Sequence, residues 1–381
     1  MILRFLCPAL GLAAACAVAE TNAPPCVDVF DSGTAGYASI RIPAIVRTGA
    51  GTLLAFAEGR VRPADQAENK IVLKRSGDDG KSWSALQVIA ERGRDSLNNP
   101  CAVVEATSGR VLLMYQSYPA GAHEHGSLRE GWDAEPYVHS WLIASDDDGK
   151  SWTPPQDVTP SVKHPKTATT VASGPGIGIQ LKSGPHAGRL LVPFNEGPPG
   201  RWQVYATFSD DGGKTWACGE NAPGAIVRDA KGREVSVVNE VQMVELADGA
   251  VRLNSRHGGG TPFRTTAVSR DGGRTWSKVE EARDLREPAC MASVLRARDP
   301  ADGAPGLLLY SGPAPDGRRD GALSASRDDG ATWQPLRPIY TGGFAYSCLV
   351  PLPGGDVGCL FERDGYKHIS FLRLPLEAAP Q

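Results

Sequence analysis

The sequence predicts an all-β protein built from repeated antiparallel sheets, and three observations support this fold class. One eight-residue pattern, Ser-x-Asp-x-Gly-x-x-Trp, occurs five times, and a glycine followed by a short apolar run occurs six times. Helical periodicity is nearly absent, whereas 44 glycines and 30 prolines among 381 residues are typical of a body rich in turns. The recurrence of both patterns indicates an array of similar units.

The five copies of the eight-residue pattern, called aspartate boxes below, begin at Ser76, Ser145, Ser209, Ser269 and Ser326. Their serine and aspartate side chains can bond nearby backbone N–H groups, the glycine provides a left-handed turn residue, and the tryptophan ring can pack beneath. Successive box aspartates lie between 57 residues (271 to 328) and 69 residues (78 to 147) apart. This period predicts one hairpin-closing box in each structural unit.

The six glycine-led apolar runs predict buried strands, because each run is short and bounded by turn residues. They begin at Gly51, Gly109, Gly188, Gly249, Gly306 and Gly355. There is room for another strand between each run and the next box, so six four-stranded antiparallel blades, a six-bladed β-propeller, are predicted. The chain ends soon after the sixth run, so the segment near the N-terminus is expected to supply the closing strand.

Length and charge favour one closed body and exclude some functions. A chain of 381 residues could form two or three average domains, but repetition across most of it predicts a single domain over residues 20–381. The net charge of −3 with 22% charged residues provides no basic footprint for nucleic acid. We therefore expect a monomer with no nucleic-acid partner.

Residues 1–19 have the pattern of an export signal peptide. An early Arg4 precedes an apolar run, and Ala17-Val18-Ala19 forms a cleavage signal before Glu20. An alternative is lipoprotein processing at Cys16, which follows a loose lipobox. No other stretch is long and apolar enough to span a bilayer. An exported protein, periplasmic or extracellular and free or lipid-anchored, is expected.

Cysteine and histidine usage predicts neither a metal nor an organic cofactor. No Cys-x-x-Cys pair occurs, and the seven histidines form no ligand spacing. Six cysteines remain after the leader, an even number for an oxidising compartment, and their pairing cannot be derived from their spacing. They are Cys26, Cys101, Cys218, Cys290, Cys348 and Cys359.

Polar residues recur seven positions after five of the six glycines. They are Glu58, Gln116, Asn195, Arg256 and Glu362, whereas the fifth run departs from the pattern and has Ser311 near its end. If these runs are the innermost strands, their ends converge on the propeller axis. The sequence therefore predicts one polar cup at the centre of the ring.

The segment Arg41-Ile42-Pro43 resembles the Arg-Ile-Pro motif of the exo-sialidases, the retaining neuraminidases of bacteria and animals. Together with the aspartate boxes, the resemblance extends over almost the whole chain after the leader. The aromatic residue that precedes the arginine in the family is replaced by Ile40. The resemblance implies an exo-α-sialidase that hydrolyses terminal sialic acid from glycans or glycoproteins with retention of configuration.

The family binds the substrate carboxylate with three arginines, whose planar forks bond a carboxylate bidentately and stay charged. By similarity these are Arg41, Arg256 and Arg318, and the adjacent Arg319 competes for the third place. Glu362 is expected to orient Arg41 through a buried ion pair, because an arginine cluster needs a counter-charge.

The resemblance assigns the reaction to three further residues. Tyr346 is the implied nucleophile and Glu240 its base, because a phenol with a pKa near 10 needs a partner that takes its proton. A neutral phenol also avoids the repulsion that a carboxylate would feel from the substrate's own carboxylate. Asp65 is implied to be the general acid and, in the second half-reaction, the general base.

The resemblance also predicts residues around the reaction centre. Glu58 and Arg60 are expected to line the pocket near the acid, Asn99 to face the N-acetyl group, and residues 194–196 to lie near the glycerol chain. The insert between Gln116 and Trp141 is the longest departure from the repeat. It is expected to cover the cup.

Two alternative functions remain open on the sequence alone. Aspartate boxes also occur in propellers that only bind glycans or proteins, although such a propeller has no need for three arginines and a Tyr-Glu pair. A trans-sialidase would keep the same site and transfer the sugar to another hydroxyl. Its acceptor would need aromatic residues at the rim, for which Trp132 and Trp202 are candidates.

Overall fold

The computed structural model describes residues 26–126, 128–166, 168–301 and 306–376. Within these ranges the helical segments are one four-residue α-helix, α1 (Thr159–Val162), and two three-residue 3-10 turns, so the predicted all-β class is confirmed. None of these helices has the length and apolar character needed to cross a membrane. The expected signal peptide and Cys16 lie outside the described residues.

The strands of the first half form three antiparallel sheets. The first contains β2 (Ser39–Arg47), β3 (Leu53–Arg60), β4 (Lys70–Ser76) and β5 (Gln87–Ala90). The second contains β6 (Ser96–Val104), β7 (Val111–Tyr118), β8 (His139–Ser145) and β9 (Gln156–Asp157), with β11 (Gly176–Ile177) added in parallel to β6. The third contains β10 (Val171–Ser173), β12 (Ile179–Gln180), β13 (Leu190–Glu196), β14 (Gln203–Ser209) and β15 (Ala217–Cys218).

The second half follows the same plan. A fourth sheet contains β18 (Val241–Glu245), β19 (Val251–Ser255), β20 (Phe263–Ser269) and β21 (Glu280–Arg286), and a separate hairpin contains β16 (Ile226–Arg228) and β17 (Glu234–Ser236). The remaining strands form one seven-stranded sheet: β22 (Ser293–Arg298), β23 (Leu307–Gly312), β24 (Arg319–Ser326), β25 (Gln334–Pro351), β26 (Val357–Arg363), β27 (His368–Leu374) and β1 (Val27–Asp31).

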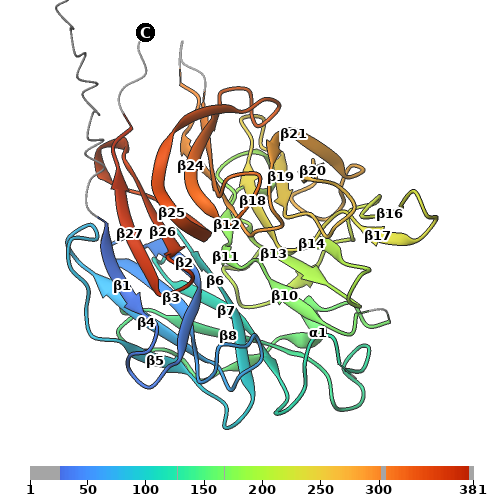
Figure 1. Ribbon diagram of the computed structural model, residues 1–381, viewed down its shortest axis with the longest axis horizontal. Coiled ribbons are helices and arrows are strands. Elements are labelled where there is room, and N and C mark those ends of the chain that lie inside the picture. Colours follow the sequence, from blue (N-terminus) through green and yellow to red (C-terminus); the bar gives the residue numbers. More distant parts are fainter. Residues whose placement is uncertain (1–25, 127, 167, 302–305, 377–381) are drawn as a thin grey trace, which may run out of the picture.

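The long strand β25 belongs to two units of the ring. Its first part, from Gln334 to Gly343, pairs with β24, and its second part, from Phe344 to Pro351, pairs with β26. When β25 is divided at this point, the described strands fall into six groups based on four strands each. These groups follow one another around a common centre in the order of the sequence (Figure 1).

All six glycine-led runs are strands, but the condition that they are the innermost strands does not hold. They form β3, β7, β13, β19, β23 and β26, each the second strand of its group. The innermost strands are those before them, such as β2, which contacts β6 and β25. The reason is that the glycine marks the turn between the first and second strands, as Gly51 does with a φ of +93°.

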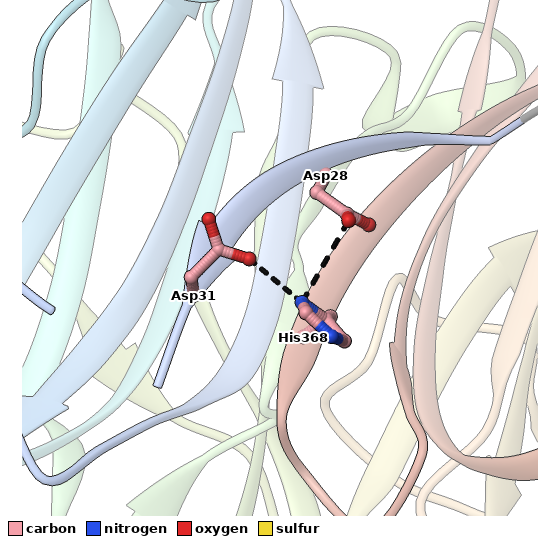
Figure 2. A group of neighbouring side chains, drawn as sticks. All are labelled: Asp28, Asp31 and His368. Atoms are coloured by element: carbon pink, nitrogen blue, oxygen red, sulfur yellow. Dashed lines mark hydrogen bonds and ion pairs between the residues drawn. The ribbon is translucent and has the colours of Figure 1, made fainter. Parts of the chain in front are cut away.

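The ring closes between the two ends of the chain, as the sequence predicts. β1 pairs antiparallel with β27, with Val27 opposite Phe371. Figure 2 shows the side chains at this seam, where His368 contacts Asp31 through Nδ1 at 2.7 Å and lies 3.7 Å from Asp28. Arg363 donates to both carboxylate oxygens of Asp28, so ion pairs reinforce the closing strand pair.

The five aspartate boxes have one hydrogen-bond pattern in common. In each box the serine Oγ accepts from the glycine N–H, at 2.7 to 2.9 Å. The aspartate accepts from the backbone N–H and from the hydroxyl of a Ser or Thr four residues later, as Asp78 does from Ser82. This hydroxyl position, just before the tryptophan, is an element of the box that the sequence pattern omitted.

The box glycines need their conformation and their lack of a side chain. Gly80 has a φ of +88°, and a Cβ at this position would lie 2.1 Å from the ring of Phe371. Trp83 of the same box meets Phe371 edge to face, with ring centroids 5.6 Å apart. Each box therefore fastens its hairpin and also joins two neighbouring units.

The six described cysteines form no disulfide, and all of them are free thiols. Cys101, Cys290, Cys348 and Cys359 are buried, where they pack as small apolar side chains. Burial raises the pKa of the Cys348 thiol to about 12, which keeps that thiol protonated and unreactive.

Candidate active site

A cavity of about 330 Å³ lies at the centre of the ring, lined mainly by polar side chains. Each of the six strand groups contributes to it from the inner end of a strand or from an adjoining loop. Nine of the predicted or repeat-positioned site residues line it: Arg41, Arg60, Asp65, Asn99, Asn195, Glu240, Arg256, Arg318 and Tyr346. The repeat thus gathers side chains that are far apart in the sequence.

Arg41 is held by a buried carboxylate. It lies at a bulge in β2, and its Nε and Nη2 atoms donate to the two oxygens of Glu362 at 3.0 and 2.9 Å. Glu362 is fully buried and also accepts from the backbone N–H groups of Ile42 and Tyr346. Burial lowers the pKa of Arg41, but Glu362 together with Tyr346 and Tyr366 raises it, and the net pKa is above its usual value, so the guanidinium stays charged.

Tyr346, Glu240 and Arg256 form a closed triangle of hydrogen bonds. The Tyr346 hydroxyl donates to Glu240 Oε1 at 2.6 Å. Arg256 Nη1 donates to Glu240 Oε2 at 2.6 Å and to the Tyr346 oxygen at 2.8 Å. The structure therefore brings the predicted nucleophile into contact with its predicted base, from β25 and from the residue before β18.

The environment of Tyr346 keeps its phenol neutral. Burial and the Glu240 carboxylate raise the pKa of Tyr346 well above its usual value, against the opposing influence of Arg256 and Arg41. The proton can leave only toward Glu240, and the phenolate that results would receive the Arg256 hydrogen bond. This arrangement suits a nucleophile that is activated during attack.

The structure distinguishes Arg318 from Arg319, which the sequence left open. Arg318 lines the cavity, where Nη1 donates to the hydroxyl of Tyr366 at 2.9 Å and Nη2 to the carbonyl of Ala289 at 3.0 Å. Arg319 is half exposed outside the cavity and pairs with Asp316 and Asp320. Of these two adjacent arginines, Arg318 is therefore the one that lines the cavity.

Asp65 lies at the edge of the cavity on the loop after β3. Its side chain is 56% exposed, and Arg60 Nη1 contacts it at 2.8 Å. Burial raises the pKa of Asp65, but Arg60 together with Arg41 and His123 lowers it, and the net pKa is below its usual value, so the open site holds Asp65 as a carboxylate. Glu58 does not line the cavity as expected, because its fully buried carboxylate turns beneath the floor to bind Arg60.

Only part of the predicted sugar-facing segments reaches the cavity. Asn99 and Asn195 line it. Phe194 is buried in the core, and Glu196 turns away to accept from Asn221 and to contact the His164 ring, because a strand points successive side chains to opposite faces. The alternation of residues in β13 was the signal that could have separated these three positions.

The insert after β7 does cover part of the cavity. Glu124 and His125 of the insert line it, together with Tyr118 at the end of β7, and the Glu124 carboxylate lies 3.3 Å from His125 Nε2. Of the two predicted rim tryptophans, Trp202 lines the cavity and Trp132 does not.

Comparison with known proteins places this arrangement in a family. The model of the BNR repeat-like domain matches residues 43–359. A sialidase of Micromonospora viridifaciens is 35% identical over 351 residues, which cover 88% of this chain and 51% of the relative. A sialidase of Bacteroides fragilis is 29% identical over 375 residues, with 92% and 64% covered. The chain thus spans about half to two thirds of these relatives.

Solved structures agree with the sequence comparison. The Hadza microbial sialidase Hz136 superposes with a TM-score of 0.80 at 28% identity, covering 92% of this chain and 68% of that structure. An intramolecular trans-sialidase from Ruminococcus gnavus has the same fold, with a TM-score of 0.77 at 20% identity, covering 93% and 99%. The chain therefore belongs to the BNR repeat-like domain family, and its relatives there are sialidases.

Proposed function

We propose that the chain is an exo-α-sialidase, which hydrolyses terminal sialic acid from glycans or glycoproteins. One observation carries this proposal: Arg41, Arg256 and Arg318 meet around a tyrosine that is bonded to a glutamate. Sialic acid bears its carboxylate on the anomeric carbon, so a site that cleaves it must hold cations beside the nucleophile. The sialidase relatives add independent support.

The three arginines differ in how much of their charge is already paired. Glu362 binds two donors of Arg41, and Glu240 binds one donor of Arg256. Arg318 contacts a hydroxyl and a carbonyl and forms no ion pair with any carboxylate of the described residues. Arg318 therefore has the largest unpaired charge for a substrate carboxylate.

The first half-reaction would form a bond between Tyr346 and the sugar. The Tyr346 oxygen attacks the anomeric carbon while Glu240 takes the phenol proton, and Arg256 stabilises the charge on the oxygen. Asp65 donates a proton to the departing sugar oxygen. A double displacement of this kind retains the anomeric configuration.

Asp65 needs a proton for this step, although the open site favours its charged form. A bound sugar would remove water from the half-exposed carboxylate, and this desolvation raises the pKa of an acid. After the leaving group departs, the Asp65 carboxylate would activate the water that releases the sugar. Its position at the edge of the cavity suits both half-reactions.

Transfer to another hydroxyl is the second candidate. The anhydrosialidase of the leech Macrobdella decora is 32% identical over 58% of this chain, and Trp202 lies at the rim, where an acceptor would bind. Both reactions would use the same tyrosine, so the arrangement of the arginines is equally consistent with either.

Proton NMR of a reaction with an α2,3-linked sialoside tests the proposal. A sialidase would first release α-anomeric free sialic acid, whereas a transferase would give a new glycoside or an anhydro product. Absence of any product with α2,3-, α2,6- and α2,8-linked substrates would refute the proposal and leave a glycan-binding propeller.

A further inference from the structure

Tyr366 contacts two arginines of the cavity, Arg41 and Arg318. It lies in the turn between β26 and β27, and its ring centroid is 4.0 Å from the guanidinium carbon of Arg41. Its hydroxyl accepts a hydrogen bond from Arg318 Nη1 at 2.9 Å. Tyr366 is not among the residues that line the central cavity, but together with Arg318 it lines a smaller adjoining pocket of about 100 Å³.

The backbone of Tyr366 is held in an unfavourable conformation. Its φ is +68°, a region that a bulky residue adopts only when its surroundings impose it. The Ser32 hydroxyl donates to the Tyr366 carbonyl at 2.7 Å and accepts from the N–H of Ile40 at 2.9 Å. Because Ile40 precedes Arg41, the hydroxyl of Ser32 connects the turn to the strand that bears this arginine.

We propose that Tyr366 is a positioning residue that fixes two arginines of the carboxylate site, Arg41 through its ring face and Arg318 through its hydroxyl. The inference rests on the proposed sialidase function, because it concerns the same carboxylate. It also links the closure of the ring to the binding site, because Ser32, which follows the closing strand β1, contacts the turn that contains Tyr366.

The contacts of the two arginines explain why such a residue is needed. Glu362 fixes Arg41 in the plane of its guanidinium, and the Tyr366 ring covers a face that Glu362 cannot reach. Arg318 has no carboxylate partner among the described residues, so two neutral acceptors and the face of the Tyr346 ring, 5.4 Å from its guanidinium carbon, orient its long side chain. Ordering that side chain in advance lowers the entropy cost of binding.

Two substitutions separate the hydroxyl from the ring. Tyr366→Phe removes the acceptor of Arg318 and keeps the ring, and we expect KM for an aryl α-sialoside to rise about fivefold. Tyr366→Leu removes both contacts, and we expect a rise of about thirtyfold. In both variants kcat should stay within about twofold of the wild type, because the lost contacts serve ground state and transition state alike.

Tyr340→Phe is the matched control. The hydroxyl of Tyr340, a residue of β25, donates at 3.0 Å to Asp364, which lies in the same turn as Tyr366. It contacts neither Arg41 nor Arg318. Each phenylalanine variant therefore removes one hydroxyl contact of the turn, and only Tyr366→Phe removes one of the two acceptors of Arg318. Calorimetric binding of free N-acetylneuraminic acid to each variant gives a readout that does not depend on turnover.

The outcomes distinguish the two proposals. Weaker binding by Tyr366→Phe with normal binding by Tyr340→Phe supports the inference. If the wild type binds and hydrolyses sialosides but both variants match it, or if kcat falls while KM stays constant, the positioning role is wrong. If the wild type neither binds sialic acid nor cleaves a sialoside, the proposed function itself fails.

Discussion

The aspartate boxes and the central cavity are built in opposite ways. Each box is one short segment whose hydrogen bonds span two to four residues, and the same set is repeated five times at the outer hairpins. The cavity contains no repeated set, and its bonds join distant positions, such as Tyr346 to Glu240 across 106 residues. The repeated hydrogen bonds of the boxes stabilise the strands, and the residues that differ between units line the cavity.

This contrast implies different tolerance to mutation. A box has four equivalents elsewhere in the ring, so the loss of one removes a fraction of the total stabilisation. Each cavity residue has its own partner and its own position, and no other unit can replace it. Substitutions in the cavity should therefore affect activity strongly and stability little, whereas substitutions in a box should do the reverse.

The largest expected effect is that of Tyr346→Phe, which we predict to lower kcat roughly 10³-fold by removing the nucleophilic oxygen. Tyr310→Phe is the control, because Tyr310 is equally buried, 6% exposed, and its hydroxyl has no partner among the described residues. Steady-state kinetics and a thermal melt of both variants check this. Normal turnover by Tyr346→Phe would contradict the mechanism.

The next effect compares two adjacent arginines. Arg318→Ala should lower kcat/KM about fiftyfold by removing charged donors to the substrate carboxylate. Arg319→Ala should leave it within about twofold, because Arg319 pairs with exposed aspartates outside the cavity. Kinetics with one aryl α-sialoside at low substrate concentration measure both values. Equal losses in the two variants would show that the loop, and not the Arg318 side chain, matters.

A smaller effect, on stability, is expected in a box. Asp147→Ala removes the acceptor of the Ser151 N–H and hydroxyl, and we predict a fall in Tm of roughly 2 °C with unchanged kcat/KM. Asp146→Ala is the matched neighbour, whose nearest cation is 3.6 Å away in Arg110. Differential scanning calorimetry compares the two. A loss of activity in Asp147→Ala would contradict the conclusion that the boxes affect stability and not activity.

The smallest effect concerns acid stability. The Ser82 hydroxyl and backbone N–H lower the pKa of Asp78 to about 2. Because the folded pKa lies below the unfolded value near 3.9, the stabilisation is present above pH 4 and is lost as the pH falls toward 2. Asp78→Asn should flatten the fall of Tm over this interval slightly. Identical curves for Asp78→Asn and the wild type would refute the assignment.

Much of the strand arrangement was predictable from the sequence, because it depends on residues that are close together in the chain. Serine, aspartate and glycine within one box determine its turn, and each glycine-led run has the apolar pattern of a buried strand. Which strand of a unit is innermost stayed open, because a glycine before a strand marks a turn but does not say which side of that turn faces the axis.

The candidate site was predictable in its residue types but not in its exact partners. The motif around Arg41 indicated a carboxylate site, and the structure brings Glu362 to it across 321 residues. No motif marks Tyr366, because its contacts are with Arg41 in β2 and with Arg318 in the loop before β24. Glu58 carried the right repeat position, yet its carboxylate lies under the floor, bonded to Arg60.

The sequence by itself determined the repeated units, their turns and the set of polar residues available to a central cup, because these depend on contacts within a few residues. The tertiary structure decided which of two adjacent arginines enters the cavity and that the Glu58 carboxylate turns away from it to bind Arg60. Those choices depend on how six groups of strands pack around one axis. A shift of one residue along a strand turns the side chain from the cavity to the opposite face of the sheet.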